Sequence, residues 1–393
     1  MNVRLFVKKS VRYISCAVKY SLALILSPFV KNRKEYRDLW LIAERGIDAR
    51  DNAYYLFKYI TRNNPEINIA YVISRDSADR SRAAKLGRII DYAGFKHFLA
   101  VAVSKVKIST HIMGYTPYID FFVRADKLGL VGGKKIFLQH GIIKDNLTYL
   151  YDNNVNIDLF VCSAKPEYEY VRDNFGYKDG VVKLLGLCRY DDLIKNTELT
   201  KKVLIMPTWR YSLQGADKHT FMESEYFKSF DALLNSGRLK DILNKYGCEA
   251  LFYPHIEMQG FIDCFTACEK VRIMTFNDCT VQSLLINSDV LITDFSSVFF
   301  DYGYMEKPMI FYQFDEESFR KQHYREGYFN YKRDAFGKVV YDLDAVLNEL
   351  EKILSRNAEI ESEYLDRING FFKLRDRNNS KRNFNAVKEI AEL

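Results

Sequence analysis

Short apolar segments alternate with helix-like segments along most of this chain, and no other feature of the sequence restricts its fold as much. Apolar runs that fit buried strands lie at 39–43, 68–74, 106–110, 135–138 and 159–162, and a second series lies at 203–206, 250–253, 271–275, 290–292 and 309–312. Segments with helical periodicity lie at 53–61, 95–103, 167–174, 230–245, 281–287 and 298–305, and a charged helical stretch covers 358–393. Strands that alternate with helices form parallel sheets, so the sequence predicts an α/β fold.

The chain length of 393 residues favours two domains, because a single core seldom grows beyond about 250 residues. A polar stretch at 191–202 stands directly before a strand and marks the expected boundary. We therefore expect a first α/β domain at 38–196 and a second at 197–393, with a cleft between them. Ligands of such sheets bind beyond the carboxyl ends of the strands.

The first 37 residues, called the basic head below, are strongly basic, whereas the remainder of the chain, the body, is nearly neutral. They carry nine Lys and Arg residues against one Glu, a net charge of +8, whereas the whole chain has +7, which leaves −1 for the remainder. The longest uncharged run, Tyr20–Val30, has 11 residues, so we expect no bilayer-spanning helix, which needs about 20. The pattern predicts a basic amphipathic helix at 1–37 that lies on an anionic membrane surface, and the alternative is a helix packed on its own domain. The near-neutral body argues against nucleic-acid binding.

Several classes of site lack their sequence signatures. The seven cysteines include no C-x-x-C pair and no partner at finger-like spacing, so we expect reduced cysteines and no metal site. Neither G-x-x-x-x-G-K-[ST] nor G-x-G-x-x-G occurs, which argues against a P-loop ATPase or a dinucleotide enzyme. No cofactor is expected.

Two histidines stand at predicted carboxyl ends of strands. His140 can take a proton at neutral pH, and the following Gly141 lets the backbone turn sharply or approach a ligand. His255 follows another strand. Each histidine on its own has a structural alternative, as a satisfied core or loop residue. Their common position at strand ends favours a role in a ligand site.

Two further strand ends carry groups suited to phosphate. A polar turn leads from the strand 290–292 into a helix, and the first N–H groups of a helix bind phosphate. The candidate ligand-binding residues are Thr293, Asp294, Ser296 and Ser297 in this turn, together with Thr208 and Arg210 after the strand 203–206. A guanidinium matches phosphate oxygens. The structural alternatives are that Asp294 or Ser296 caps the helix and that Arg210 pairs with a carboxylate.

At these residues the chain resembles the CDP-glycerol glycerophosphotransferase family of teichoic acid and capsule biosynthesis. The resemblance runs from about 39 to 328 and rests on Gln139-His140-Gly141, Leu185-Gly186-Leu187-Cys188-Arg189-Tyr190-Asp191, Pro207-Thr208-Trp209-Arg210, Pro254-His255 and the block from Thr293 to Pro308. It implies a GT-B fold of two Rossmann-like domains, an acceptor domain at 38–196 and a CDP-donor domain with C-terminal helices at 197–393. It also implies peripheral attachment to the cytoplasmic face of the cell membrane, in agreement with the basic head.

The resemblance implies a transferase that moves glycerol phosphate from CDP-glycerol, or ribitol phosphate from CDP-ribitol, to a lipid-linked saccharide acceptor and releases CMP. His140 resembles the family's histidine proposed as general base, and His255 with Ser296 and Ser297 resembles its donor-phosphate contacts. Ile142 and Ile143 stand where the family often has Thr-Pro, and Pro254 precedes His255 instead of following it. The length fits a primase that adds one unit but does not exclude a polymerase. Two alternatives stay open: a GT-B glycosyltransferase that uses a nucleotide sugar, and a non-catalytic membrane scaffold of the same fold.

Overall fold

A computed structural model describes the backbone of residues 3–196, 198–322 and 325–393, and the side chains of these segments from residue 9 onward. The expected domain boundary at residue 197 lies outside the described residues. The chain forms two compact units. The first comprises Met1–Ile142, Thr148–Asp191 and Leu374–Leu393, and the second comprises Ile143–Leu147 and Asp192–Lys373.

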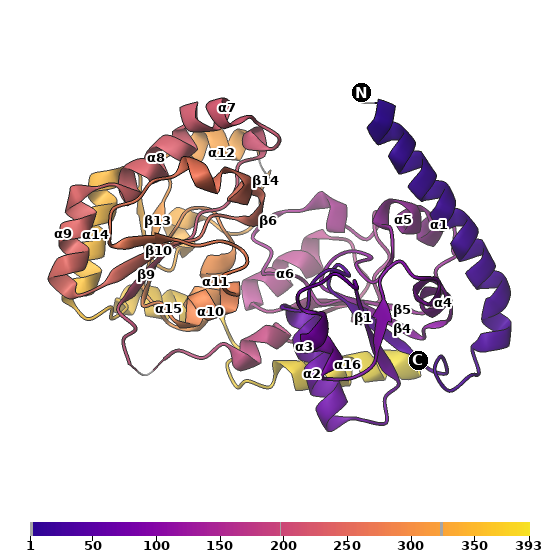
Figure 1. Cartoon of the computed structure of the whole chain (residues 1–393). Coiled ribbons are helices and arrows are strands. Elements are labelled where there is room, and N and C mark those ends of the chain that lie inside the picture. Colours follow the sequence, from indigo (N-terminus) through magenta and orange to yellow (C-terminus); the bar gives the residue numbers. More distant parts are fainter. Residues whose placement is uncertain (1–2, 197, 323–324) are drawn as a thin grey trace. The chain divides into compact units, whose positions relative to one another are not determined.

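The first unit is built on a parallel sheet of seven strands in the order β3-β2-β1-β4-β5-β7-β8. Figure 1 labels the adjacent strands β1, β4 and β5 of this sheet. Its strands are β1 (Trp40–Ala43), β2 (Ile69–Ile73), β3 (Ile89–Asp91), β4 (Val106–Ser109), β5 (Lys134–Phe137), β7 (Leu159–Cys162) and β8 (Val182–Leu184). Its helices are α1 (Val3–Val30), α2 (Asn52–Asn63), α3 (Arg80–Ala84), α4 (Phe95–Val103), α5 (Ile119–Lys127), α6 (Lys165–Asn174) and α16 (Asn379–Glu392). The strands read as apolar runs because helices cover both faces of the sheet. One face packs on α2 and α16 and the other on α1, α4 and α5.

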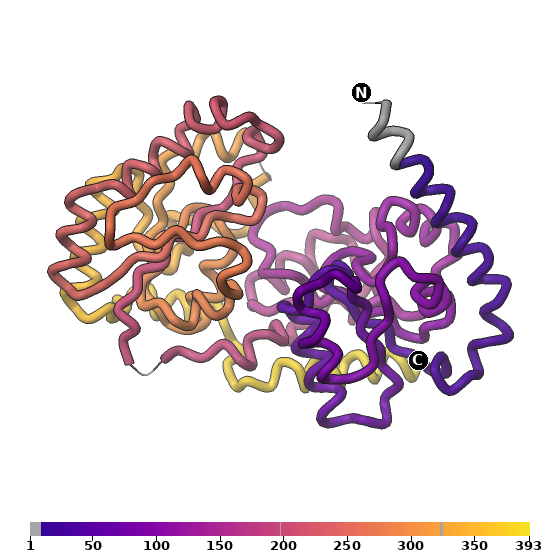
Figure 2. The backbone as a smooth tube through the Cα atoms, viewed as in Figure 1, coloured from indigo at the N-terminus to yellow at the C-terminus, as the bar shows by residue number. Residues whose placement is uncertain are grey.

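Helix α16 completes the first unit, whereas the sequence had assigned residues 374–393 to the second domain. Its apolar face packs beside α2, and the Phe384 ring lies 6.0 Å from the Trp40 ring. The Asp191 carboxylate accepts the backbone N–H groups of Asn379 and Ser380 and so caps the helix. Figure 2 shows the yellow C-terminal segment returning to the indigo and purple elements of this unit. Periodicity predicts that the segment is helical but cannot show which sheet it covers.

The second unit contains a parallel sheet of six strands in the order β11-β10-β9-β12-β13-β15. Its strands are β9 (Lys202–Ile205), β10 (Glu249–Phe252), β11 (Val271–Ile273), β12 (Val290–Thr293), β13 (Met309–Tyr312) and β15 (Lys338–Val340). Its helices are α7 (Lys218–Glu223), α8 (Glu225–Leu234), α9 (Gly237–Tyr246), α10 (Val281–Ile286), α11 (Val298–Tyr304), α12 (Glu316–Gln322), α13 (Tyr331–Asp334), α14 (Leu343–Ser355) and α15 (Ser362–Phe371). A small antiparallel ribbon joins β6 (Asp145–Asn146) to β14 (Arg325–Glu326).

One predicted helix of this unit is two helices. The sequence predicts a helix at 230–245, but α8 ends at Leu234 and α9 begins at Gly237. The Ser236 hydroxyl caps α9 by accepting the N–H of Leu239. The capping serine marks the start of a new helix. Because both helices have apolar periodicity, the break between them does not show in the sequence pattern.

Helix α1 packs one face on the first unit and leaves the opposite face exposed. Tyr20 is buried, stacks edge-on against Phe122 at 4.7 Å and donates to the Leu130 carbonyl. The exposed apolar side chains recur every three or four residues and are between 48% and 75% exposed: Val11, Ile14, Val18, Leu22, Ile25 and Phe29. By length and composition alone, Lys9–Val30 is sufficient to cross a membrane, whereas the sequence analysis expected no spanning helix; that expectation stays a prediction. The uncharged run understated the apolar length because Arg12 and Lys19 lie among apolar residues.

Candidate functional site

His140 follows β5 on a loop that is fixed by an unusual backbone conformation one residue earlier. Gln139 has a φ of 61°, in the left-handed region that costs a non-glycine residue energy. Its buried side chain donates to the Val161 carbonyl at 2.5 Å and to Glu167 at 3.1 Å. Its carbonyl accepts the Asn52 amide at 2.8 Å. Neighbouring elements therefore hold this loop in a shape that it would not adopt alone.

The His140 ring stays 71% exposed while its inner nitrogen is held by Asp51. Nδ1 lies 2.5 Å from Asp51 Oδ2, and the other carboxylate oxygen accepts from Arg189 and from the Asn52 N–H. Although burial of the Asp51 carboxyl opposes it, the positive charges of His140 and Arg189 lower its pKa to about 2. Asp51 is therefore ionised at neutral pH and orients His140 so that a neutral ring carries its lone pair on the exposed Nε2.

Asp51, His111 and Arg189 belong to this cluster but were not predicted as site residues from the sequence. Asp51, His111 and His140 follow β1, β4 and β5, which are adjacent parallel strands, so their loops meet at one edge of the sheet. The His111 ring lies 5.0 Å from the His140 ring, and burial followed by the nearby His140 charge lowers the His111 pKa to about 4. The signal for His111 was its position directly after an apolar run. Gly141 is half-buried beside His140, but the left-handed residue of this loop is Gln139.

Arg189 belongs to the motif 185–191, and the structure explains why these residues occur together. Arg189 Nη1 donates to Asp51 at 2.8 Å and to the His140 carbonyl at 2.7 Å. Gly186 has a φ of +83°, and a Cβ there would lie 1.9 Å from the Asn379 amide oxygen. Only glycine fits where α16 passes this close. The same seven residues thus brace the histidine loop and anchor the last helix.

In the second unit, Arg210 is buried and bound to two carboxylates. Its guanidinium makes a two-pronged contact with Asp315, at 2.6 Å and 2.9 Å, and a third with Asp294 at 2.8 Å. The Arg210 side chain is 5% exposed and that of Asp294 is fully buried. Of the two alternatives for Arg210, the structure shows the carboxylate pair. Arg210 and Asp294 therefore connect the loops after β9, β12 and β13 and present no free charge to solvent.

Thr208 and Thr293 differ in access although both follow strands. The Thr293 hydroxyl is buried and donates to the Met206 carbonyl at 2.7 Å. Thr208 is half-buried, and its backbone N–H donates to Asp294 at 2.8 Å. Thr293 and Asp294 thus hold the turn after β12 through buried hydrogen bonds, whereas Thr208 lies at the surface.

The serine pair and His255 are the more accessible of the predicted residues in this unit. Ser296 is half-buried and accepts the Val298 N–H at 3.3 Å, while Ser297 is exposed at the start of α11 and makes no side-chain cap bond. His255 follows β10, and its Nδ1 accepts the Glu257 N–H at 3.3 Å, which places the ring hydrogen on Nε2. Its ring stacks on Trp209 at 6.3 Å. Because β10, β9 and β12 are neighbours, these loops share one sheet edge.

The two histidines therefore suit opposite roles, His140 as a proton acceptor and His255 as a hydrogen-bond donor. The partner of His140 leaves a lone pair on its exposed nitrogen, whereas the partner of His255 leaves a hydrogen there. Over the described ranges 3–196, 198–322 and 325–393, no group of three or more His, Cys, Asp and Glu side chains is arranged to hold a metal ion. The absence of a cofactor stays a prediction.

Comparison with known proteins gives consistent matches. A family model described as CDP-Glycerol:Poly(glycerophosphate) glycerophosphotransferase matches residues 25–389, a longer stretch than the expected 39–328. The minor teichoic acid biosynthesis protein GgaB of Bacillus subtilis (strain 168) is 35% identical over 370 residues, which are 91% of this chain and 40% of that protein. The teichoic acid poly(glycerol phosphate) polymerase of the same organism is 22% identical over 82% of this chain and 46% of its own length. This chain thus spans less than half the length of these two relatives.

Solved structures support the same fold. A structure of the wall teichoic acid polymerase TagF matches with a TM-score of 0.69 at 18% identity, covering 100% of this chain and 99% of that one. An Anabaena protein in complex with UDP-glucose matches with a TM-score of 0.53 at 9% identity, covering 90% and 100%. The fold is therefore α/β and GT-B-like. Since the family model covers nearly the whole sequence, this chain belongs to the CDP-glycerol:poly(glycerophosphate) glycerophosphotransferase family.

Proposed function

We propose that this chain transfers glycerol phosphate, or a related polyol phosphate, from CDP-glycerol to a lipid-linked acceptor at the cytoplasmic membrane and releases CMP. Family membership and the names of its teichoic acid relatives support the reaction class. The observation that carries the proposal is the exposed His140 ring held at Nδ1 by Asp51. Such a pair suits a group that must take a proton from a hydroxyl.

The proposed reaction is an in-line displacement at phosphorus. The acceptor hydroxyl attacks the phosphorus nearer the polyol, and the bond between this phosphorus and the bridging oxygen breaks. His140 Nε2 takes the hydroxyl proton, and the ionised Asp51 stabilises the imidazolium that forms. CMP leaves as a phosphate monoester with a second pKa of about 6, so it needs little protonation. Orientation and charge stabilisation then carry most of the rate enhancement.

We assign donor binding to the accessible groups of the second unit. His255 would donate its Nε2 hydrogen to a pyrophosphate oxygen, and Ser296 and Ser297 would donate hydroxyl hydrogens. Thr208 stays a proposed donor contact, and Gly141, which belongs to the first unit beside His140, stays a proposed substrate contact, because both are partly accessible. Arg210, Thr293 and Asp294 would act one step away, by holding the loops that carry these groups. CDP-ribitol is the other donor consistent with this assignment.

We propose that helix α1 attaches the protein to an anionic membrane without crossing it. Its exposed stripe would enter the bilayer interface, and the basic residues near both ends of the helix would face lipid headgroups. Crossing would require the helix to leave its own unit, including the Tyr20 contacts and the Arg12 bond to the Pro117 carbonyl. The attachment would bring the enzyme to a lipid-linked acceptor.

A nucleotide-sugar glycosyltransferase is the second candidate, because the protein solved with UDP-glucose has a similar fold. Nucleotide release separates the candidates. The whole chain, with vesicles containing a lipid-linked saccharide, is incubated in turn with CDP-glycerol, CDP-ribitol, UDP-glucose and UDP-N-acetylglucosamine. The proposal predicts CMP and a phosphodiester product from a CDP-polyol. Release of UDP with a glycosidic product would replace it, and no turnover by a folded, membrane-bound chain would favour the scaffold alternative.

H140A tests the base assignment within this assay. The variant should keep CDP-glycerol binding, because His140 belongs to the first unit and donor binding is assigned to the second, but should lose turnover. H219A is a matched control, since His219 is an exposed histidine on α7 to which no role in the reaction is assigned. Full turnover by folded H140A would remove His140 from the mechanism.

A further inference from the structure

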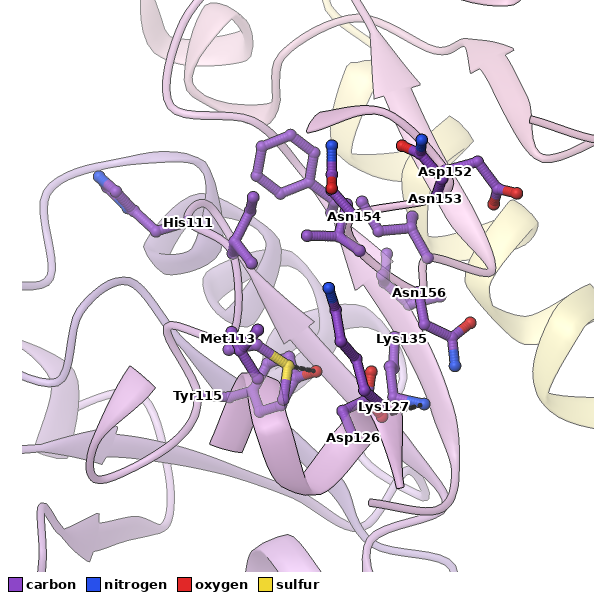
Figure 3. A pocket seen from close by; sticks show the side chains of 16 residues that line it. His111, Met113, Tyr115, Asp126, Lys127, Lys135, Asp152, Asn153, Asn154 and Asn156 are labelled. Carbon is purple, nitrogen blue, oxygen red and sulfur yellow. Dashed lines mark hydrogen bonds and ion pairs between the residues drawn. The ribbon is translucent and has the colours of Figure 1, made fainter. Parts of the chain in front are cut away.

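A cavity of about 240 Å³ lies inside the first unit. Figure 3 shows the side chains that line it, among them His111. His111 forms part of its wall, and the His111 ring lies 5.0 Å from the His140 ring. The other walls come from the end of α5, from β5 and from the loop before β7. The polar and aromatic lining used below consists of Tyr115, Asp126, Lys135, Phe137, Asn153 and Asn156.

The cavity volume matches one small building block. A water molecule occupies about 30 Å³ in the liquid, so 240 Å³ holds the equivalent of about eight waters. Sites for larger organic ligands usually enclose about 300–1,000 Å³. A single sugar ring or a single glycerol phosphate therefore fits by size, and the charge of the cavity must distinguish the two.

The charges that line the cavity balance and leave no surplus for an anion. The lining includes two cations, Lys127 and Lys135, and two anions, Asp126 and Asp152. The Lys135 ammonium lies 3.1 Å from Asp126, and both side chains are more than nine-tenths buried. Burial keeps His111 neutral, with a pKa of about 4. A phosphodiester would enter a lining that carries no net positive charge, and burying an uncompensated charge is costly.

The same lining offers what a neutral sugar requires. An ammonium has three N–H donors, and the ion pair with Asp126 uses one, so Lys135 can also bind hydroxyl oxygens. The Asn153 and Asn156 side chains, exposed on the loop before β7, can donate and accept at once. Phe137 and Tyr115 supply apolar ring surface, which matches the C–H faces of a pyranose.

We infer that this cavity is an acceptor subsite that binds one neutral glycosyl unit, adjacent to the hydroxyl that His140 deprotonates. This inference rests on the proposed function and makes it more specific. A saccharide unit of the acceptor, and not a polyol phosphate unit, would be recognised next to the reacting end. The enzyme would therefore discriminate acceptors by the sugar they present.

Direct binding tests the subsite without using turnover. Saturation-transfer NMR is recorded on the full chain with glucose, N-acetylglucosamine and glycerol 3-phosphate as separate probes. The double variant N153A/N156A removes two amides, and V155W fills the cavity, since Val155 lines it. N63A is the control, because Asn63 is an asparagine of the same unit at the far end of α2, where it bonds the Tyr59 carbonyl.

We expect at least one sugar to bind the wild type, with its dissociation constant raised about tenfold in N153A/N156A through the loss of two neutral hydrogen bonds. V155W should abolish the signal and N63A should preserve it. Absence of sugar binding, equal binding in all variants, or a cavity-dependent signal from glycerol 3-phosphate alone would overturn the inference. If cavity-dependent sugar binding accompanies no CMP release from any CDP-polyol, the subsite stands and the proposed reaction fails.

Discussion

The substitution D51N isolates the contribution of one charge to the proposed base. Asn has the shape of Asp and can still cap helix α2, where Asp51 accepts the Asn52 N–H at 2.8 Å. It removes the negative charge that lies 2.5 Å from His140 Nδ1. The fold should therefore survive while the imidazolium loses its counter-charge.

The expected loss follows from the geometry. Two unit charges about 4 Å apart interact by about 4 kcal/mol at an effective dielectric constant of 20. The His140 ring is 71% exposed, so solvent screening reduces this to about 2 kcal/mol, which is about 30-fold in rate. An Asn amide can also turn its N–H₂ group toward Nδ1 and favour the tautomer that cannot accept a proton at Nε2. We expect kcat to fall by about 30-fold to 1,000-fold.

The assay is steady-state CMP release from CDP-glycerol with a lipid-linked acceptor, with thermal unfolding measured alongside. D342N is the matched control, because Asp342 also caps a helix, α14, by accepting the Ala345 N–H, and has no histidine partner among its described contacts. The Michaelis constant for CDP-glycerol should stay unchanged. A kcat of D51N within twofold of wild type, with H140A inactive, would refute the conclusion that Asp51 acts through His140.

Three further perturbations test other parts of the structure. R210M leaves Asp294 and Asp315 buried without their cation and should lower the free energy of unfolding, measured in urea, by about 3–5 kcal/mol. The control R238M, at a half-exposed arginine, should change it by less than about 1 kcal/mol. Equal effects of the two substitutions would contradict a buried ion cluster. Burial of the His97 ring lowers its pKa to about 4 against 6.5 when unfolded, so the unfolded chain binds more protons between these values. The free energy of unfolding should therefore fall by up to about 3 kcal/mol as the pH drops from 6.5 to 4, and H97Q should flatten this slope; an unchanged slope would exclude His97 as its source. I14E/I25E places charge on the exposed stripe of α1 and should reduce the amount of protein that sediments with anionic vesicles at least tenfold. The control I194E, in the other unit, should not reduce it. An equal loss in both variants would show that α1 is not the anchor.

The central strands could be located from sequence within about one residue because helices bury both of their faces. The predicted strands at 159–162 and 309–312 coincide with β7 and β13. Three edge strands, β3, β8 and β15, were missed; each has three residues and only one of them is buried, although the similar edge strand β11 was predicted at 271–275. Short edge strands lack the continuous apolar signal of central ones.

The site was only partly predictable for a related reason. The rule that ligands bind at strand carboxyl ends located His140, His255 and the serine turn. It could not show that Arg210 points inward, because sequence position does not reveal exposure. It also could not pair Asp51 with His140 across 89 residues, because sheet order determines that contact.

The return of α16 to the first unit has a consequence for protein synthesis. Its residues leave the ribosome after the whole of Asp192–Lys373, so the second unit has its complete sequence before the first. Until α16 arrives, the apolar face around Trp40 has no cover from Phe384 and Val387. The nascent chain therefore carries an open apolar surface during translation of nearly half its length, the kind of surface that chaperones bind.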